Sequence, residues 1–581
     1  MRNADLAQLF EEIADLLEIK GENPFRVRAY RRAAERLEAL AEDVAAIAAR
    51  DGLEEIQGIG KDLAGKIKEY LETERLPYLE ELRVDIPTGV VEMTHIRGVG
   101  PRTAKLLFDQ AGVDSVEKLE ALARAGKLRG LPGIQAKTEE KVLKGIAVWR
   151  AGRERTPLGR ALPLAEAIVA ALRGLPGVSR IEPAGSLRRM RETVKDVDIL
   201  VTAADPGPVM DAFVGLPQVA EVLARGETKS SVRLAEGIQA DLRVVAPEAF
   251  GAALQYFTGS KAHNIRVREL AVRKGLKLSE YGVFAEPGGR RVAGATEEEV
   301  YAALGLPWIP PELREDTGEV EAALEGRLPP LVEVGQIRGD LHCHTNWSDG
   351  HLPPEELVRA AKARGYEYVA ITDHSRSSTV ANGLDARRLA EQREAVEALR
   401  RRVKGITILH GSEVDIRADG TLDFPDEVLA GLDVVVVSVH SRFTQDERTM
   451  TERIVRALKN PHVRILGHAT GRLLGERDPY PVDLEQVFAA AREAGVAVEI
   501  NASPQRLDVN DRQARRAREL GLSLAINTDA HAEAHLDYLR LGVGVARRAW
   551  LGPGEIVNCR ATKDLLAWLR RPDARRATRD A

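Results

Sequence analysis

Two groups of residues in this 581-residue chain have the types and spacing that metal-dependent phosphoryl chemistry requires. In the first group, Asp196 and Asp198 begin the apolar run DVDILV, and Asp241 begins a second run, DLRVVA. Side chains alternate along a strand, so Asp196 and Asp198 face the same side. Carboxylates this close repel one another unless a cation lies between them. We therefore expect the three to hold two Mg²⁺ or Mn²⁺ ions about 3.5–4 Å apart, with Asp241 alternatively acting as a general base.

A glycine and a serine, Gly185 and Ser186, stand shortly before the first run. The glycine permits close backbone approach to a ligand, and the serine hydroxyl can donate to a phosphate oxygen. Arg188 and Arg189 follow as candidate triphosphate ligands. The order G-S, D-x-D and a later Asp resembles the nucleotidyltransferase superfamily. An isolated D-x-D would equally fit exposed acids at a strand end.

The second group is rich in histidine, since ten of the twelve histidines lie after residue 336. Most end short apolar runs together with acidic residues. Imidazole and carboxylate ligands without cysteine suit zinc, manganese or iron. One such histidine alone would fit a hydrogen-bonded core residue, but nine candidates predict a metal cluster. They are His342, His344, Asp349, His374, Glu413, His440, His468, Asp529 and His531.

Hydrophobic periodicity predicts the elements that position these residues. Residues 1–155 show the apolar spacing of amphipathic helices, and strand-like runs appear from about residue 160. A Pro-rich acidic stretch at 308–330 predicts a linker. After it, strand-like runs alternate with helices, which predicts a barrel of parallel strands. In such a barrel the carboxyl ends of the strands converge on one active face.

A short unit recurs in the helical part. IQGIGKDLAGKI and IRGVGPRTAKLL share a Gly-x-Gly turn before a helix, and LRGLPGIQAKTEEKV is a degenerate third copy. The glycines Gly58, Gly60, Gly98 and Gly100 permit a tight turn and leave backbone N–H groups facing outward for a phosphate. The units resemble helix-hairpin-helix motifs, which bind the DNA backbone without reading sequence. Residues 93–160 also carry fourteen Lys/Arg against seven Asp/Glu, which fits phosphate contact or a solvated helix face.

The subtype is indicated by YFTGS, Tyr256 to Ser260, followed by Asn264 and Arg268. This segment resembles the nucleotide-binding part of family X DNA polymerases, and the resemblance covers about residues 1–315. It implies that Tyr256 and Phe257 pack against the incoming sugar, although they would also fit ordinary core aromatics. It implies that Asn264 contacts the base edge and that Arg268 reaches the DNA template. The implied dNTP-binding residues are Gly185, Ser186, Arg188, Arg189, Tyr256, Phe257, Gly259, Ser260 and Asn264.

The first repeat carries Lys66 in a setting that resembles the lyase domain of the same family. There, the matching lysine forms a Schiff base with the sugar aldehyde at an abasic site. That chemistry requires a neutral amine. Lys61 and Lys68 lie nearby and could serve equally.

The histidine-rich part resembles the PHP family of metal-dependent phosphoesterases over about residues 337–575. The resemblance implies three divalent metals, Zn²⁺, Mn²⁺ or Fe. One takes His342, His344, Glu413 and Asp529. Glu413 bridges to a second metal with His440 and His468. Asp349, His374 and His531 take the third, with His468 and His531 exchanged as the alternative.

Together these features predict a multidomain α + α/β protein. We expect a lyase-like helical domain at 1–92, a fingers-like domain at 93–155, a nucleotidyltransferase palm at 156–245, a thumb at 246–316, a linker at 317–336 and a distorted TIM-like PHP barrel at 337–581. The hydrophobic fraction of 44% excludes a disordered chain, and the two cysteines exclude a disulfide scaffold. The absence of a long apolar run or signal peptide predicts a cytoplasmic, nucleoid-associated monomer with no membrane contact.

The resemblances imply a DNA polymerase that fills short gaps in base excision or end repair, with gapped or primer-template DNA and dNTPs as partners. They also imply a 3′→5′ exonuclease in the barrel, with abasic-site cleavage and 3′-phosphate removal as further options. The alternatives are a repair nuclease whose polymerase half positions DNA, a non-catalytic DNA-end scaffold with structural metals, and a small-molecule phosphatase.

Overall fold

The computed structural model describes residues 2–38, 44–56, 58–73, 75–94, 96, 98–132 and 134–570. It divides into two compact units, one formed essentially by residues 1–153 and the other by the rest. Gly133 of the third repeat copy and residues 571–581 of the expected barrel lie outside the described residues. No helix within the described ranges combines the length and the hydrophobicity needed to cross a membrane.

The first unit is helical, as its periodicity predicts. Its core is a single cluster built around Phe10, Tyr30 and Leu37 of the first two helices and continued by Leu107 and Leu119. The helices are α1 (Arg2–Lys20), α2 (Pro24–Glu38), α3 (Val44–Ala49), α4 (Lys61–Thr73), α5 (Pro77–Asp85), α6 (Thr88–Thr94), α7 (Pro101–Ala111), α8 (Val116–Arg124) and α9 (Ala136–Glu154), with 3-10 turns η1 (Gly52–Glu55) and η2 (Leu128–Gly130).

The palm is a five-stranded sheet in the order β2-β4-β7-β6-β5. Only β4 and β7 pair in parallel. The palm elements are β1 (Thr156–Pro157), α10 (Leu158–Arg173), β2 (Val178–Pro183), α11 (Gly185–Arg188), β3 (Thr193–Val194), β4 (Asp196–Ala203), α12 (Pro206–Val214), β5 (Val219–Arg225), β6 (Lys229–Leu234) and β7 (Gln239–Val244).

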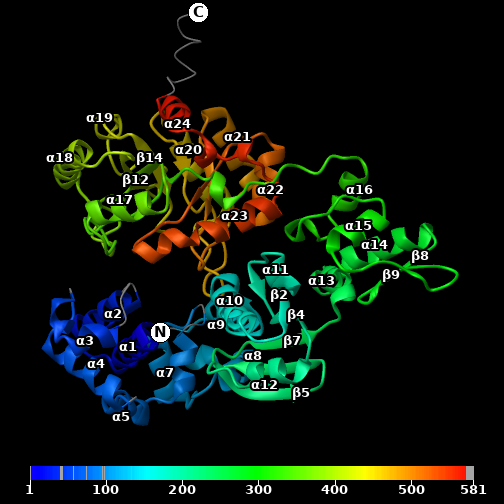
Figure 1. Cartoon of the computed structure of the whole chain (residues 1–581). Coiled ribbons are helices and arrows are strands. Elements are labelled where there is room, and N and C mark those ends of the chain that lie inside the picture. The colour runs from blue at the N-terminus through cyan, green and yellow to red at the C-terminus, as the bar shows by residue number, and fades with distance from the viewer. Residues whose placement is uncertain are drawn as a thin grey trace, which may run out of the picture. The chain divides into compact units, whose positions relative to one another are not determined.

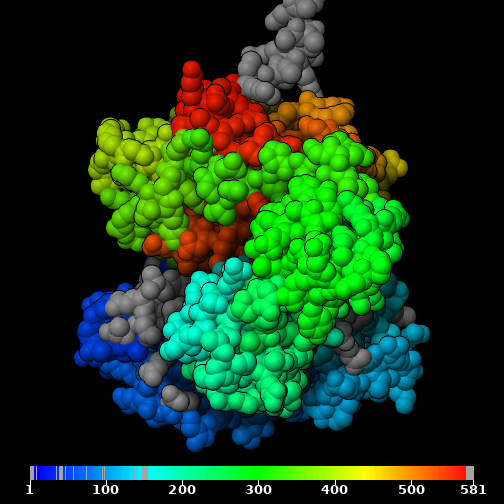
Figure 2. All heavy atoms as spheres, turned by 45° about the vertical axis from the view of Figure 1, so that its right-hand side comes forward, coloured from blue at the N-terminus to red at the C-terminus, as the bar shows by residue number. Residues whose placement is uncertain are grey.

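The thumb packs directly on the palm, as Figure 2 shows for the green segment beside the cyan one. Phe250 and Leu254 of the thumb join Ala184 and Leu200 of the palm in one buried cluster. The thumb elements are η3 (Pro247–Ala249), α13 (Phe250–Thr258), α14 (Lys261–Arg273), β8 (Leu276–Ser279), β9 (Gly282–Ala285), β10 (Arg291–Ala293), α15 (Glu297–Ala303), η4 (Pro311–Leu313) and α16 (Glu319–Leu324).

The stretch expected as a linker at 317–336 differs from that expectation. It forms α16, whose Val320 and Ala323 are buried in the thumb core. Glu319 is fully buried and its Oε1 lies 2.6 Å from Nδ1 of His263. At the other end, Val332 donates its backbone N–H to Leu551 in the barrel. The acidic composition of this stretch suggested a solvent-exposed segment. Residues 319–324 are instead packed in place by their apolar face and by the buried contact between Glu319 and His263.

The C-terminal part is a seven-stranded parallel sheet in sequence order, β11 to β17. A parallel bridge between Cys343 and Ala530, just beyond the first and last strands, nearly closes the sheet into the expected barrel. In Figure 1 the helices α17, α18 and α20 surround the strands β12 and β14. The strands are β11 (Gly339–Asp340), β12 (Tyr368–Ile371), β13 (Thr407–Asp415), β14 (Val434–Ser438), β15 (Ile465–Leu466), β16 (Ala497–Asn501) and β17 (Leu524–Asn527). The helices are η5 (Val334–Gln336), α17 (Pro354–Ala363), α18 (Ala386–Arg402), α19 (Asp426–Leu429), α20 (Glu447–Leu458), α21 (Leu484–Ala494), α22 (Asp511–Glu519), η6 (Glu533–Tyr538), α23 (Leu539–Arg548), η7 (Pro553–Glu555), η8 (Val557–Cys559) and α24 (Thr562–Leu569).

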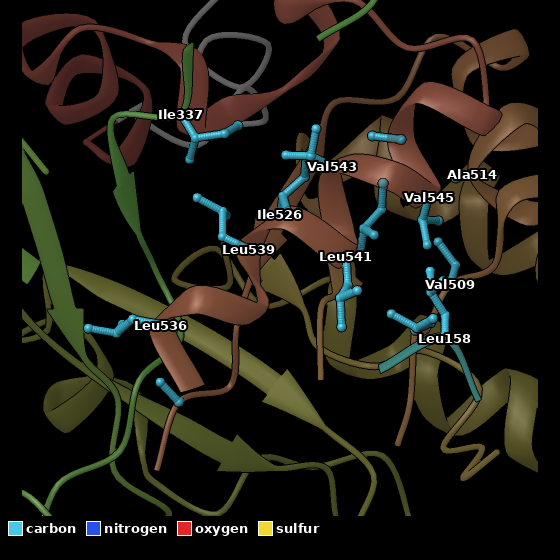
Figure 3. Packing of buried hydrophobic residues seen from close by; sticks show 14 of the residues in the cluster. Leu158, Ile337, Val509, Ala514, Ile526, Leu536, Leu539, Leu541, Val543 and Val545 are labelled. Atoms are coloured by element: carbon cyan, nitrogen blue, oxygen red, sulfur yellow. The ribbon is translucent and has the colours of Figure 1, made fainter. Parts of the chain in front are cut away.

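The palm and the barrel share one hydrophobic core. Figure 3 shows Leu158, the first residue of α10, beside Val509 of the barrel, and both belong to this cluster. The two parts therefore form one packed body.

Candidate active sites

The three palm carboxylates meet on neighbouring strands. In the parallel register of β4 and β7, Asp198 stands opposite Asp241, and Asp196 stands opposite Gln239. Burial and the nearby charges of Asp196 and Asp241 raise the pKa of Asp198 to about 6. Lys229 lies 2.8 Å from Asp241. Burial raises the pKa of Asp241, but hydrogen bonds from Lys229, Gln239 and Ser231 together outweigh it and lower that pKa. Clustered carboxylates that raise a neighbour's pKa fit a divalent-cation site.

A cavity of about 800 Å³ opens at this cluster. Seven of its lining side chains are basic and three are acidic, which suits a polyphosphate. Sequence reasoning missed five of the basic ones, because lone arginines and lysines carry no motif signal. The charged lining residues are Arg155, Arg189, Arg191, Lys195, Lys261, Arg268 and Arg512, with Asp196, Asp198 and Glu315.

Two glycines of the predicted site have a positive φ, which favours glycine, and a Cβ on either would lie close to a neighbouring side chain. Gly185 has φ +64°, and a Cβ there would lie 2.5 Å from Oδ2 of Asp198. Gly259 has φ +68°, and a Cβ there would lie 3.1 Å from Nη1 of Arg189. The backbone of G-S thus runs directly beside the Asp198 carboxylate.

The two arginines after G-S have different environments. Arg188 donates both Nη atoms to the buried Glu297 at 2.8 Å and is absent from the cavity lining. This placement does not fit the expectation that Arg188 binds the triphosphate. Arg189 does line the cavity, with its Nε held 3.0 Å from Glu315.

The YFTGS segment lies at the end of a helix. Tyr256 and Phe257 end α13 with their rings 5.1 Å apart, and both line the cavity. Ser260 caps α14 by accepting from the backbone N–H of His263 at 3.2 Å. Asn264 lines the cavity, while its Nδ2 donates to the carbonyl of Tyr256 at 2.7 Å. Of the predicted nucleotide-contacting residues in this segment, Tyr256, Phe257, Gly259 and Asn264 line the cavity, and Ser260 is absent from its lining.

Arg268 also reaches the cavity, where the sequence predicts template contact. Its Nε donates to the carbonyl of Asn264 at 3.1 Å.

The helix-hairpin-helix turns have matching geometry. Ile59 donates its N–H to Ile56 at 2.9 Å, and Val99 donates to Ile96 at 2.8 Å. Gly58 and Gly98, between these partners, have φ of +91° and +96°, which only glycine adopts readily. A Cβ at Gly60 or Gly100 would meet nothing within 4 Å, so open space faces the start of α4 and α7.

The structure also places Lys66 on α4. Its Nζ lies 2.7 Å from Asp62 and 5.1 Å from the centre of the Tyr78 ring. Only 14% of the side chain is exposed. Lys68 instead pairs with Asp51.

All nine histidine-cluster candidates converge at the carboxyl ends of the barrel strands. Glu413 is central: its Oε1 lies 3.2 Å from His440 Nε2 and 2.9 Å from His468 Nε2. Its Oε2 lies 3.4 Å from His342 Nε2 and 3.6 Å from His344 Nε2. Glu413 therefore lies between the histidines that the PHP resemblance assigns to two different metals.

The remaining ligands surround Asp529 and Asp349. His344 Nε2 lies 3.1 Å from Asp529. Asp349 lies 3.5 Å from His374 Nε2 and 3.4 Å from His531 Nε2. Because His468 lies beside Glu413 and His531 beside Asp349, the geometry favours the expected partition over the exchanged one.

Several buried nitrogen and oxygen atoms of the cluster have no hydrogen-bond partner among the described residues, which suits the binding of cations. Within the described residues, His342 Nε2, both ring nitrogens of His344 and Glu413 Oε2 are buried without a hydrogen-bond partner. Burial and the neighbouring His531 and His374 lower the pKa of His344 to about 4, so its imidazole is neutral and ready to bind a metal. The histidines around Glu413 outweigh burial and hold its pKa well below the ordinary range.

Sequence reasoning missed the carboxylates that orient these ligands. Glu499 accepts from His342 Nδ1 at 2.8 Å and from the backbone N–H of His468 at 2.9 Å. Asp415 lies 3.1 Å from His440 Nδ1. Such partners fix the ring orientation and leave the other nitrogen free for a metal. A charged residue inside the apolar run VAVEIN was the available signal for Glu499.

Family comparisons match each part of the chain. The helix-hairpin-helix domain matches residues 1–76 and the SAM-like helix-hairpin-helix tandem matches 90–147. The DNA polymerase beta thumb matches 253–315 and the PHP domain matches 340–503. A Bacillus subtilis protein named DNA polymerase/3′-5′ exonuclease PolX is 41% identical over 575 residues, which is 99% of this chain and 100% of that protein. The chain belongs to the family X DNA polymerases that carry a C-terminal PHP domain.

Other relatives share parts of this family X chain. Rat DNA polymerase lambda is 28% identical over 290 residues, 45% of this chain and 48% of that protein. A probable phosphatase of Thermoanaerobacter is 30% identical over 234 residues, 38% of this chain and 89% of that protein. The family and fold predicted from the sequence are confirmed, while the individual site residues stay predictions.

Proposed function

We propose that this chain fills short gaps during DNA repair with its palm and thumb, and trims 3′ ends with its barrel. Family membership supplies the two activities, DNA polymerase and 3′→5′ exonuclease. The observation that carries the proposal is the convergence of both candidate sets: Asp196, Asp198 and Asp241 meet beside a basic cavity, and eight other candidate ligands gather with Glu413.

In the polymerase site, the residues hold the nucleotide and the primer end. Arg189, Ser186 and the Gly185 backbone bind the triphosphate, which the basic lining keeps in place. Divalent ions held by the three aspartates would neutralise the triphosphate and assist loss of the primer-hydroxyl proton. Asp241 stays ionised beside Lys229, so it can hold a cation or accept that proton.

The thumb residues select the nucleotide. Tyr256 and Phe257 pack on the sugar, with Gly259 and Ser260 carrying the backbone past it. Asn264 reads the base edge, and Arg268 contacts the template strand.

In the barrel, the chain's residues orient a phosphodiester and a water molecule. Metals held by the nine ligands would activate the water and neutralise the leaving 3′ oxygen. Glu499 and Asp415 fix the His342 and His440 rings so that Nε2 of each points inward. Abasic-site cleavage and 3′-phosphate removal use the same attack on phosphorus and are further activities of this site.

The N-terminal unit binds DNA through its helix-hairpin-helix turns, whose open glycines Gly58, Gly60, Gly98 and Gly100 admit a phosphate. Lys66 is the lyase nucleophile, with Lys61 and Lys68 as alternatives. Borohydride trapping on abasic DNA tests this assignment, and an undiminished adduct with Lys66→Ala would exclude Lys66. We infer a monomer acting on nucleoid DNA in the bacterial cytoplasm.

The experiment uses the full chain and a 5′-labelled primer in a one-nucleotide gap, with Mn²⁺, with and without dNTPs. Asp196→Ala/Asp198→Ala should abolish extension and leave shortening intact. His344→Ala should do the reverse. These variants control for each other, because each retains one activity as proof of folding.

Other outcomes support the alternatives. Shortening without extension by the unmodified chain would favour a repair nuclease whose polymerase half positions DNA. Tight DNA binding with neither product would favour a scaffold. Hydrolysis of small phosphate esters alone would favour a phosphatase.

A further inference from the structure

One barrel residue belongs to the wall of the polymerase cavity. Arg512, in the first turn of α22, lines the cavity that holds Asp196 and Asp198. All its other lining residues come from positions 155–315. The cavity is therefore completed by a side chain from the PHP domain.

A chain of ion pairs fixes this wall. Arg548 of α23 donates to Asp511 at 2.6 Å and to Glu315 at 3.0 Å. Glu315 accepts from Nε of Arg189 at 3.0 Å. Arg548 also donates to the carbonyl of Arg189 at 2.8 Å. Asp511, the neighbour of Arg512, is thus linked through Arg548 and Glu315 to Arg189, which lies three positions after the G-S motif.

Arg512 differs from the other arginines of its helix. Arg515, Arg516 and Arg518 each lie within 3.6 Å of a carboxylate. Among the described residues, no carboxylate forms an ion pair with Arg512, and its side chain is exposed into the cavity. An arginine left without an anion beside a basic cavity is placed to bind a ligand phosphate.

Arg189, which the sequence predicts to bind the triphosphate, is largely occupied. Its Nε is held by Glu315, its Nη1 donates to the carbonyl of Thr258, and only 12% of its side chain is exposed. Arg188 is bound to Glu297. Arg188, and Nε and Nη1 of Arg189, are thus held by protein groups, which leaves Nη2 of Arg189 for a triphosphate and makes further phosphate ligands useful.

We propose that Arg512 binds a phosphate of the incoming nucleotide, so that the PHP domain supplies one ligand of the polymerase site. This inference rests on the proposed polymerase site. The barrel would then contribute to nucleotide binding in the polymerase site, and this contribution would not depend on the hydrolytic activity of the barrel.

The test compares Arg512→Ala, Arg512→Lys and Arg516→Ala in the full chain. Arg516 is the matched control, because it lies one turn further along α22, is exposed and pairs with Glu485. Steady-state extension of a one-nucleotide gap gives KM for dNTP and kcat. Fluorescence anisotropy gives the Kd for gapped DNA, and primer shortening without dNTP reports exonuclease activity.

Arg512→Ala should raise KM for dNTP about tenfold, the effect of one lost charge-assisted hydrogen bond. The kcat, the DNA Kd and the exonuclease rate should change less than about twofold, because the exposed side chain supports no buried contact. Arg512→Lys should recover most of the loss, since it restores the charge. Arg516→Ala should match the unmodified chain.

An unchanged KM in Arg512→Ala, while the unmodified chain extends primers, overturns this inference alone. A weaker DNA Kd with an unchanged KM also overturns it, because the phosphate would then belong to a DNA strand. Failure of the unmodified chain to extend overturns the polymerase site itself, and this inference with it.

Discussion

Glu499→Gln should lower the exonuclease activity of the barrel although it replaces none of the nine proposed metal ligands. The Glu499 carboxylate is fully buried and accepts four hydrogen bonds. His342 Nδ1 and Asn527 Nδ2 donate to Oε1, each at 2.8 Å. The backbone N–H of His468 and Asn501 Nδ2 donate to Oε2, at 2.9 and 3.1 Å.

Glutamine has the same shape but only one acceptor oxygen. In either orientation its NH₂ group faces two donors. At about 1–3 kcal/mol for each unsatisfied buried donor, the variant should lose about 2–6 kcal/mol of stability. If the NH₂ group faces His342, the ring can relieve the clash by moving its proton to Nε2, the nitrogen nearest Glu413 and Asp529. That nitrogen can then no longer bind a metal.

We therefore expect exonuclease activity and metal affinity to fall about 10–100-fold. Excess Mn²⁺ should restore part of the activity. Primer extension should change less than about twofold, because the palm carboxylates are untouched. The assays are primer shortening over an Mn²⁺ titration, bound metal by mass spectrometry, and thermal unfolding.

The control is Asp423→Asn. Asp423 is also a buried carboxylate of the barrel, but it accepts from Ser377 and Arg417 rather than from a cluster histidine. It should lower stability without changing the Mn²⁺ dependence. Equal shortening rates and equal metal content in Glu499→Gln and the unmodified chain would refute the positioning role.

Three further outcomes are expected. Glu297→Gln should lower the free energy of unfolding by about 3–5 kcal/mol, because it leaves the fully buried Arg314 and the partly buried Arg188 without their counter-charge; denaturant titration measures it. The arginines outweigh burial and lower the pKa of Glu297, so its stabilisation is present above the unfolded pKa and is lost as the pH falls through the folded pKa. The stability gap between Glu297→Gln and the unmodified chain should therefore narrow in acid, and a gap that widens would contradict this sign. A chelator should abolish primer shortening and lower the melting temperature, since it leaves buried ligand atoms such as His344 Nε2 unsatisfied; an unchanged melting curve after metal loss would count against a structural contribution. Gly185→Ala should abolish extension but not shortening, because its Cβ would strike Asp198; retained extension would contradict the close approach.

The sequence predicted which residues come together when they lie on or at the end of strands, because the alternation of side chains along a strand is a local property. Asp196 and Asp198 share a face by period two, and β7 carries Asp241 into register with Asp198. The barrel ligands were predictable for the same reason, since parallel strands place their carboxyl ends together. His342 and His344 needed only alternation to face one centre.

Residues that depend on partners distant in sequence were not predictable. Arg188 and Arg189 look equivalent, but Glu297, more than a hundred positions away, holds Arg188. The segment 319–324 read as a solvated linker, because the buried His263 that receives Glu319 is not visible from composition. A lone arginine in a helix, such as Arg512, carries no pattern at all.

The palm and the barrel, which carry the polymerase and exonuclease activities, are joined by close contacts within one hydrophobic core. Gly159 approaches Pro504 so closely that a Cβ would lie 2.1 Å from the Pro504 Cβ, and a Cβ on Gly544 would lie 2.6 Å from Met190. Such contacts show that the described joint is closely packed. Met190 directly follows the arginines of the G-S segment. The barrel therefore fixes the backbone that carries Arg189, and a polymerase half cut away from it would lose this support together with the apolar cover of Leu158.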